Sequence, residues 1–196
     1  MKFVALSAIA AVVSADSFCD GQRFCVYGTG TSSSVTITVH AAASGWAGVG
    51  IGTEMTNSQL FVGWQNSTKG YTLISAKAPS QVQPTVDSPL KLTQVPLAVP
   101  APSWAKLAYS FSTSVSGISQ STNIIWAYSN SPPSSNIDSP KAQFAQHQAT
   151  GTTSGVNLLT TGSTSATPAA STTTSGSEGL IAGSVALANI LYAFVL

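Results

Sequence analysis

Charged residues are scarce in this chain, which carries seven Lys and Arg and six Asp and Glu among 196 residues. A protein that binds nucleic acid needs a basic patch to neutralise phosphates, and the sequence has no basic stripe. Hydrolysis needs a paired acid and base, and the few carboxylates give little support for such a pair. We therefore expect neither a nucleic-acid partner nor a hydrolytic site.

Cysteine is almost absent, since only Cys19 and Cys25 occur. Residues 1–15 begin with one Lys, continue as an apolar run and end in the small residues that a signal peptidase reads, so we interpret them as a secretory signal cut after Ala15. In an oxidising compartment, two such close cysteines are expected to form a disulfide. This bond would tie the N-terminal segment to the first strand.

The C-terminal region has two compositions. Residues 161–179 are rich in Ser, Thr, Gly and Ala, which cannot bury a core, so we predict a disordered, O-glycosylated stalk. Residues 180–196 are continuously apolar, and no basic segment follows them. This order is typical of a GPI-anchor signal, with attachment at either Ala169-Ala170-Ser171 or Ser175-Gly176-Ser177. The alternative is a single transmembrane helix.

Either interpretation of the C-terminal tail places the preceding domain outside the cell. We expect a secreted protein on the outer face of the plasma membrane or in the cell wall, with a lipid anchor as its only contact with the membrane.

No segment between residues 20 and 160 shows a helical period over three turns. Short runs rich in β-branched and aromatic residues are found instead, separated by turn residues at the spacing of a sandwich or barrel. We predict that residues 16–160 form a single all-β domain, an antiparallel β-sandwich. The predicted strands are residues 23–29, 34–41, 45–52, 59–65, 71–77, 90–99, 105–113 and 122–130.

The run at residues 34–41 alternates apolar and polar side chains. Alternation puts Val35, Ile37 and Val39 on one face of the strand and His40 on the other. We therefore predict that the three apolar residues face the core and that His40 faces solvent.

The stretch GWAGVGIGTEMTNSQLFVGW, residues 45–64, combines a glycine-rich strand with an unusual methionine. Glycines in a strand leave room either for something broad and planar or for tight packing between sheets, and both interpretations stay open. Apart from Met1, Met55 is the only methionine, and it lies among polar turn residues. A thioether normally fills gaps in an apolar core, so Met55 needs another explanation.

This stretch, together with GYTLISAKA at residues 70–78 and QFAQHQATG at residues 143–151, resembles the DOMON family, and most closely the cytochrome domain of fungal cellobiose dehydrogenases. The resemblance covers Phe18 to about Leu159 and implies an immunoglobulin-like β-sandwich that binds one heme b. By position, Met55 matches the axial methionine of the family and His147 the axial histidine. No Cys-x-x-Cys-His motif is present, so the heme would be bound non-covalently.

Heme iron held by methionine and histidine has both axial positions filled and exchanges single electrons. The resemblance thus implies an electron-transfer protein rather than an enzyme, and no flavin or hydrolase site is evident. Its redox partner would be a protein or a small electron donor or acceptor, such as a dehydrogenase or a copper oxygenase.

Two alternative functions remain. The first is a heme-free DOMON module that binds carbohydrate, with exposed tryptophans as stacking platforms. The second is a surface protein that binds copper through His40 and His147. His40 is also the rival candidate for the axial heme ligand, although its position does not match the family.

Two further predictions concern polar side chains. Asn66 begins an N-glycosylation sequon, Asn-Ser-Thr, within a predicted hairpin turn where a glycan could project into solvent. Lys77, Arg23 and Tyr71 are candidates to contact the heme propionates, although the sequence does not choose among them.

Overall fold

The computed structural model describes residues 16–31, 33–80, 82–86, 91–134 and 136–159. The predicted secretory signal (1–15), stalk (161–179) and apolar tail (180–196) lie outside the described residues. Within the described ranges all regular secondary structure is β, and there is no apolar helix of membrane-spanning length.

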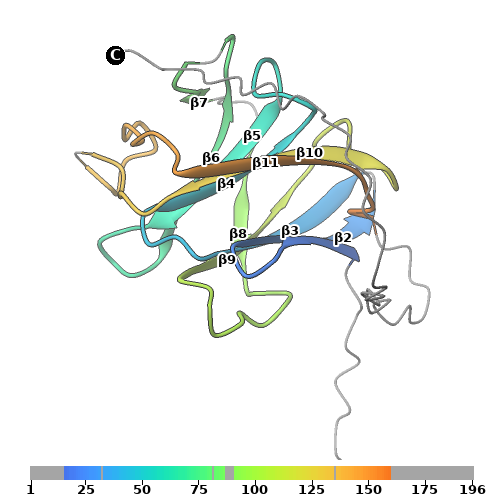
Figure 1. The fold of residues 1–196 in the computed structure, drawn as a ribbon, viewed down its shortest axis with the longest axis horizontal. Helices are drawn as coiled ribbons and strands as arrows, with labels where there is room; N and C mark the ends of the chain where they lie inside the picture. Colours follow the sequence, from blue (N-terminus) through green and yellow to red (C-terminus); the bar gives the residue numbers. More distant parts are fainter. Residues whose placement is uncertain (1–15, 32, 81, 87–90, 135, 160–196) are drawn as a thin grey trace, which may run out of the picture. The chain divides into compact units, whose positions relative to one another are not determined.

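The strands form two antiparallel sheets stacked face to face (Figure 1). The five-stranded sheet has the order β1-β2-β3-β9-β8, and the six-stranded sheet has the order β11-β10-β4-β5-β6-β7. This architecture confirms the predicted β-sandwich. The strands are β1 Asp16–Asp20, β2 Phe24–Thr31, β3 Ser34–Ala41, β4 Trp46–Ile51, β5 Gln59–Gln65, β6 Tyr71–Lys77, β7 Thr85–Val86, β8 Thr93–Val95, β9 Leu107–Thr113, β10 Thr122–Ser129 and β11 Ala149–Val156.

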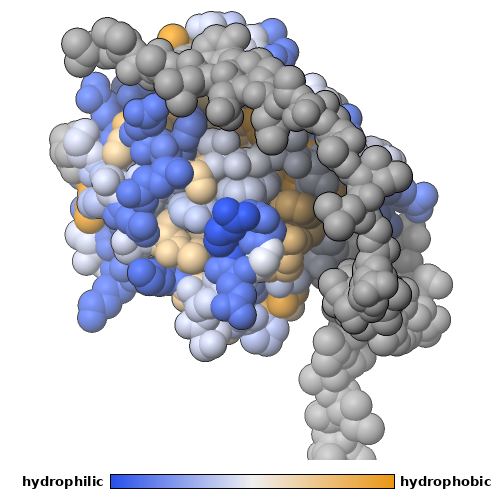
Figure 2. Space-filling view, viewed as in Figure 1, coloured by the Kyte–Doolittle hydropathy of each residue, from blue (hydrophilic) through white to orange (hydrophobic). Residues whose placement is uncertain are grey.

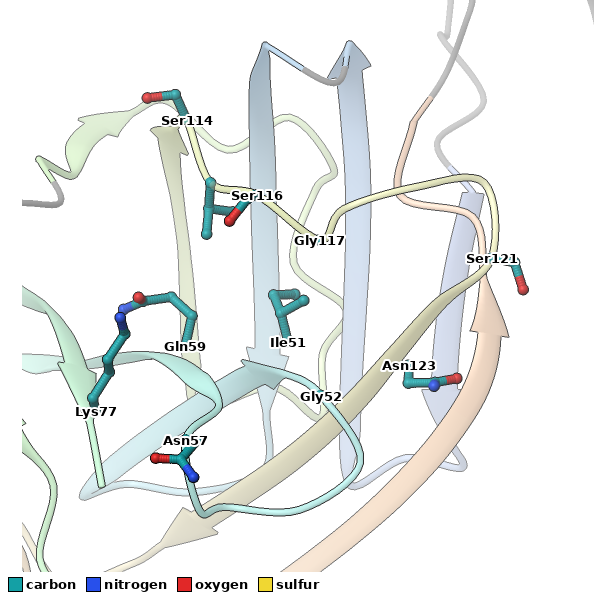
Figure 3. Close-up of a pocket in the computed structure, with 11 residues that line it drawn as sticks. Ile51, Gly52, Asn57, Gln59, Lys77, Ser114, Ser116, Gly117, Ser121 and Asn123 are labelled. Carbon is teal, nitrogen blue, oxygen red and sulfur yellow. The ribbon is translucent and has the colours of Figure 1, made fainter. Parts of the chain in front are cut away.

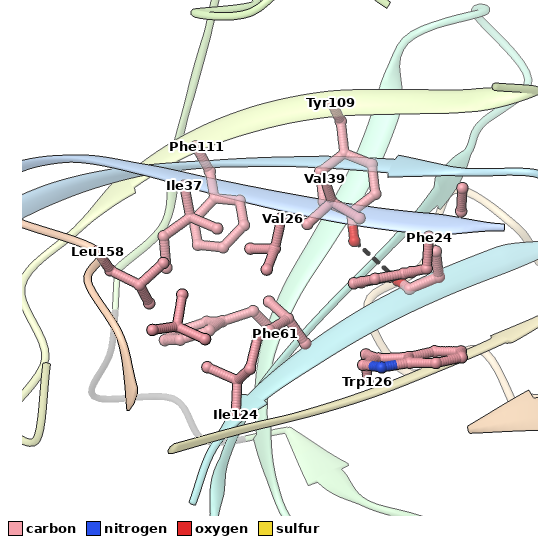
Figure 4. Close-up of a cluster of buried hydrophobic side chains, with 14 of the residues drawn as sticks. Phe24, Val26, Ile37, Val39, Phe61, Tyr109, Phe111, Ile124, Trp126 and Leu158 are labelled. Atoms are coloured by element: carbon pink, nitrogen blue, oxygen red, sulfur yellow. Dashed lines mark hydrogen bonds between the residues drawn. The ribbon is translucent and has the colours of Figure 1, made fainter. Parts of the chain in front are cut away.

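The core lies between the two sheets and is rich in aromatic rings (Figure 4). Phe24 of β2 stacks on Trp126 of β10 with ring centroids 5.1 Å apart, and Phe61 of β5 meets Phe111 of β9 at the same separation. Large aromatic side chains contribute most of the apolar burial in such a core. The predicted core-facing residues of β3 are all buried, as expected: Val35, Ile37 and Val39.

Tyr109 ties the two sheets together within this core. Its hydroxyl donates a hydrogen bond of 2.7 Å to the carbonyl of Ala47 in the opposite sheet, as drawn in Figure 4. A Cβ atom on Gly63 would lie 2.7 Å from the Tyr109 ring, so the absence of a side chain there makes the close approach possible. Burial raises the pKa of Tyr109, which keeps the phenol protonated as a donor.

The predicted disulfide between Cys19 and Cys25 is confirmed. The two residues lie directly opposite each other in the β1–β2 hairpin. At the turn of this hairpin, Arg23 forms an ion pair with Asp20 at 2.7 Å. The N-terminal segment is therefore held to the five-stranded sheet as a strand of its own, which the sequence analysis did not predict.

His40 is not exposed, so the prediction that it faces solvent is wrong. It lies on the side of β3 away from the core, yet it is fully buried by the chain between β8 and β9. Its Nε2 is 3.2 Å from the carbonyl of Val99, and its ring lies 5.1 Å from the Tyr27 ring. Alternation determines which face a residue occupies, but a later connection can cover that face.

The surface seen in Figure 2 mixes hydrophilic residues with small apolar patches. The large hydrophobic residues exposed in the described part of the chain are Val82, Val86 and Leu97. Val86 lies in β7 and Leu97 follows β8, so two of the three accompany the short edge strands. Short edge strands offer few free backbone groups to other chains.

Candidate functional site

The six-stranded sheet carries a second apolar cluster on its outer face, the face turned away from the five-stranded sheet. Alternation along β4 and β5 separates the two clusters, because Ala47 and Phe61 belong to the core while Trp46 and Val62 belong to the outer face. The buried members on the outer face are Trp46, Leu60, Val62, Trp64, Ile74, Ala76, Ala78 and Ala142, and Met55, Ile125, Ala127, Ile137 and Phe144 pack against them. An apolar face of this extent needs a cover of its own.

Gly48 and Gly50 lie in the middle of the outer face, as their pairing with Val62 and Leu60 requires. A Cβ atom on Gly50 would lie 2.6 Å from Leu60 Cδ2 and 2.7 Å from Ile125 Cγ1. These neighbours belong to the outer face, so neither glycine serves the packing between sheets, which was one of the two interpretations. Instead, outer-face side chains such as Leu60 and Ile125 close over β4 at the glycine positions and form an apolar floor there.

Met55 lies in the loop of residues 52–58 between β4 and β5 and packs, half-buried, against the outer-face cluster. Backbone hydrogen bonds hold this loop in place: the amide of Gly52 donates to Asn123 at 2.9 Å, and that of Asn57 donates to Ala78 at 2.9 Å. The side chain of Ser58 donates to the carbonyl of Glu54 across the same loop. These hydrogen bonds hold the backbone that carries Met55 beside the outer-face cluster.

The β10–β11 connection, residues 130–148, covers one end of the outer face. The indole Nε1 of Trp64 donates to the carbonyl of Ile137 at 2.7 Å, and that of Trp46 donates to the carbonyl of Ala145 at 3.1 Å. Phe144 from the same connection contacts both indole rings, with centroids 5.6 Å from Trp46 and 5.2 Å from Trp64. These contacts keep water away from this end of the face and fix the path of the connection.

His147 lies near the end of this connection, two residues before β11, and its side chain is exposed. The backbone beside it is held firmly, because the amide of Gln148 donates to the carbonyl of Tyr128 at 2.9 Å. The Gln148 side chain in turn accepts a hydrogen bond of 2.8 Å from the amide of Asn130. The imidazole is thus available to a ligand while its main chain is fixed.

The structure brings Met55 and His147 to the border of the same face, at opposite ends of β4. His147 is close to the end of β4 that holds Ala47, because Ala149 pairs with Tyr128 and Tyr128 pairs with Ala47. Met55 follows the other end of β4, a strand that is about 17 Å long at roughly 3.3 Å per residue. A soft thioether and an imidazole are donors of the kind that hold heme iron, and both lie beside this apolar face.

The rival histidine is on the other side of the molecule. His40 belongs to the five-stranded sheet, whereas His147 borders the six-stranded sheet. Among the described residues, no group of three His, Cys, Asp or Glu side chains gathers in a way that could bind a metal ion. This arrangement gives the copper alternative no support.

The carbohydrate alternative depended on exposed tryptophans, and the structure does not provide them as stacking platforms. Trp46, Trp64 and Trp126 are buried, and Trp104 is half-buried. Three of the four indole rings are therefore not available to stack on a sugar.

The three propionate candidates do not border the outer face. Arg23 pairs with Asp20 in the five-stranded sheet. Tyr71 packs against the core between the sheets, where its ring lies 5.5 Å from that of Tyr109. Lys77 lies at the end of β6 beside Gln59, on the inner side of the sheet.

Asn66 occupies the β5–β6 turn, as the sequence indicated. Its side-chain oxygen accepts hydrogen bonds from the amide of Thr68 at 3.2 Å and from the hydroxyl of Thr68 at 2.8 Å. Glycosylation of Asn66 stays a prediction, and the turn gives the sequon a defined conformation at the surface.

Comparison with known proteins gives one matching family, and the similar solved structures include two cytochrome domains. Residues 26–165 match the family described as the cytochrome domain of cellobiose dehydrogenase. The cytochrome b domain of pyranose dehydrogenase from Coprinopsis cinerea is similar with a TM-score of 0.60 and 17% identity, over 74% of this chain and 82% of that one. The cytochrome domain of Myriococcum thermophilum cellobiose dehydrogenase is similar with a TM-score of 0.55 and 18% identity, over 72% and 81%. No protein with curated annotation matches the chain.

Proposed function

Because this chain belongs to the family of cytochrome domains of cellobiose dehydrogenase, we propose that it is a b-type cytochrome with one heme bound non-covalently on the outer face of its six-stranded sheet. The observation that carries this proposal is the apolar floor at Gly48 and Gly50, with Met55 and His147 at its two ends. An apolar surface suits the largely apolar macrocycle of heme b, and a thioether and an imidazole are donors of the kind that hold its iron.

Each residue has a distinct part in this proposal. The thioether of Met55 and an imidazole nitrogen of His147 would hold the iron from opposite sides. A heme with both axial positions filled exchanges single electrons and leaves no position for oxygen. Trp46, Trp64 and Phe144 would exclude water from the covered end of the site, which favours tight binding of an apolar cofactor.

The proposal is tested by expressing the full chain in a secretory host with heme supplied and recording absorption spectra of the oxidised and reduced protein. We expect a red protein with a low-spin spectrum and about one heme per chain. Met55→Ala and His147→Ala should each change this spectrum, because each removes one axial donor.

Gln146→Ala provides the matched control, since Gln146 is the exposed neighbour of His147. It should leave the spectrum unchanged. A heme spectrum that stays at wild type in both Met55→Ala and His147→Ala would disprove the ligand assignment. A colourless protein obtained despite ample heme would disprove the cytochrome itself.

We further propose that the domain works outside the cell, anchored by lipid, and passes electrons to or from a separate redox protein or small molecule. The disulfide between Cys19 and Cys25 supports an oxidising compartment. The composition of residues 1–15 and 161–196 supports secretion and anchoring. Treatment of intact cells with a phospholipase that cleaves GPI anchors should release the protein, and retention on the cells would contradict the anchor.

A further inference from the structure

Trp46 links the outer face to the stretch of chain that carries His147. It is the first residue of β4, and it pairs with Trp64 of β5 on one side and with Ser129, the last residue of β10, on the other. Only 7% of Trp46 is exposed. Its indole Nε1 donates a hydrogen bond of 3.1 Å to the carbonyl of Ala145, two residues before His147.

The main chain around His147 is held on both sides. Before it, the Ala145 carbonyl accepts the hydrogen bond from Trp46, and after it, the amide of Gln148 donates to the carbonyl of Tyr128 at 2.9 Å. Both partners belong to strands of the six-stranded sheet. An indole N–H can only donate, so a backbone carbonyl is a suitable partner for it in a buried place. The two hydrogen bonds fasten the chain directly before and after the imidazole.

We propose that the indole N–H of Trp46 positions His147 as an axial ligand of the heme. This inference rests on the proposed function, in which His147 binds the iron. Groups that orient a metal ligand also tune the metal, and their loss typically weakens metal binding about 10–100-fold. Trp46 acts here through the main chain at Ala145, so it is a positioning residue and not a ligand.

The other proposed ligand lies beyond the far end of the same strand. Ile51 is the last residue of β4, and the loop of residues 52–58 that carries Met55 follows it. Figure 3 shows this far end of the strand, where Gly52 follows Ile51. A change at Trp46 should therefore disturb His147 and leave the loop of Met55 in place.

Trp64 offers a matched control on the same face. Its indole Nε1 donates to the carbonyl of Ile137 in the same connection at 2.7 Å, and its ring, like that of Trp46, contacts Phe144. Ile137 lies ten residues before His147, whereas the partner of Trp46 lies two residues before it. Trp64 is also fully buried, so its truncation should cost at least as much stability as that of Trp46.

The inference is tested with Trp46→Phe and Trp64→Phe in the heme-loaded full chain, because phenylalanine keeps an apolar ring and removes the N–H donor. Trp46→Phe should change the low-spin spectrum and the reduction potential, and it should lose heme to apomyoglobin at least about tenfold faster than wild type. Trp64→Phe should lower stability in urea and keep the spectrum and potential of wild type. An unchanged Trp46→Phe protein, or equal changes in the two variants, would overturn the inference.

Replacing the tethered imidazole with a free one shows whether Trp46 acts through His147. In His147→Gly, added imidazole can take the place of the missing side chain, but it is not attached to the β10–β11 connection. Trp46→Phe should then have no further effect on the spectrum or the potential, because a positioning residue acts only through the residue that it positions. A further shift as large as that in the presence of His147 would show a direct effect on the heme and refute the inference.

Hydrogen exchange in protein produced without added heme separates this inference from the proposed function. The amide of Gln148 should exchange at least about tenfold faster in Trp46→Phe than in wild type, and near the wild-type rate in Trp64→Phe. Equal exchange in Trp46→Phe and wild type would refute the fastening. A wild-type protein that stays colourless despite ample heme, yet shows this difference in exchange, would refute the cytochrome and still show that Trp46 fastens the chain at His147.

A measurement on the unsubstituted protein covers the case in which Trp46→Phe does not fold. The indole N–H of Trp46 should exchange slowly with solvent in NMR spectra, because it is buried and hydrogen-bonded to Ala145. Rapid exchange of this proton in the folded protein would refute the hydrogen bond on which the inference depends.

Discussion

Gly50 lies at a tightly packed point of the outer face. Side chains from both neighbouring strands already fill the space that its Cβ atom would need, since Leu60 Cδ2 is 2.6 Å and Ile125 Cγ1 is 2.7 Å from that position. The glycine therefore permits the close packing of these side chains beneath the proposed heme. A larger residue would raise the floor on which the heme is expected to rest.

We predict that Gly50→Val destabilises the fold by about 1–3 kcal/mol and reduces heme uptake, because overpacking forces neighbouring side chains to move. Urea denaturation and the heme-to-protein ratio measure the two effects. Gly70→Ala is the control, since the nearest atoms to its Cβ position lie 3.5 Å or more away. Equal stability of the Gly50→Val and Gly70→Ala variants would contradict the assignment of the floor.

His40 is a buried base with one unpartnered nitrogen. Its Nε2 faces the Val99 carbonyl, which can only accept, so Nε2 carries the proton and the unprotonated Nδ1 is buried without a partner. Burial lowers the pKa of His40 below its ordinary value of 6.5, and the hydrogen bond to Val99 only partly opposes this shift. The folded protein resists protonation at this position.

We predict that the protein loses stability as the pH falls below about 6.5, because the unfolded chain then binds a proton that folded His40 does not. The loss should continue down to the lowered pKa of the folded state and then level off. Unfolding free energies at pH 7.5 and 5.5 measure it, and His40→Gln should show a smaller difference between them. His147 is present in both proteins, so an identical difference would show that His40 is not the cause.

At the scale of the elements, the loop of residues 52–58 combines two constraints. Gly52 has a φ of 149°, which glycine adopts readily, and Asn57 has a φ of 61°, in the left-handed region that asparagine tolerates. The backbone hydrogen bonds to Asn123 and Ala78 hold this conformation. The loop thereby presents Met55 to the outer face without depending on a bound cofactor.

We expect Asn57→Ala to destabilise the protein by about 1 kcal/mol and to weaken the low-spin spectrum, because alanine disfavours a positive φ. Asn57→Gly removes the same side chain but keeps the backbone free to adopt this φ, so it should remain close to wild type. Chemical denaturation and the absorption spectrum of the two variants give the comparison. If alanine and glycine behave alike, the backbone conformation of the loop is unimportant.

The strands that the sequence predicted are those with β-branched or aromatic side chains. β11 was not among the predicted runs, since its sequence ATGTTSGV lacks apolar alternation and most of its residues are exposed or half-buried. It forms because it pairs with β10. Gly151 makes room for the Trp126 ring there, since a Cβ atom at this position would lie only 2.5 Å from the ring. The run predicted at residues 90–99 shortens to β8, because the segment that follows leaves the sheet and covers His40.

The candidate site was only partly predictable, because some of its parts, like β11, depend on contacts between segments that are distant in the sequence. Met55 and His147 were predicted from a motif and a resemblance, and their role as ligands stays a prediction. The part of the cover that Ile137 contributes was not predicted, because Ile137 contacts the sheet through its backbone carbonyl. This carbonyl accepts hydrogen bonds from Trp64 at 2.7 Å and from Thr72 at 3.0 Å. Every residue has a carbonyl, so the sequence contains no signal for such a contact.

In the molecule as a whole, the disulfide and the proposed heme site belong to different sheets. Cys19 and Cys25 join β1 to β2 in the five-stranded sheet, while Met55 and His147 border the outer face of the six-stranded sheet. The inter-sheet core separates them, so stability and cofactor binding should respond differently to loss of the disulfide.

We predict that the double substitution Cys19→Ala and Cys25→Ala lowers the unfolding free energy by about 2 kcal/mol, the value expected for a short closed loop. The heme spectrum and heme content should remain those of the wild-type protein. Thermal denaturation followed separately in the far ultraviolet and in the heme absorption band measures both. A changed spectrum in the folded double variant would contradict the expectation that the proposed heme site does not depend on the disulfide.

Strand β4 serves the two faces with alternate residues, since Ala47 and Val49 enter the core while Trp46, Gly48 and Gly50 face outward. Loss of a single residue within β4 would reverse the facing of every residue on one side of the gap, sending either tryptophan inward or valine outward. An evolving lineage can therefore vary the length of this protein in its connections but not within this strand. Homologous chains should show insertions and deletions between strands, with the six positions of β4 kept in phase.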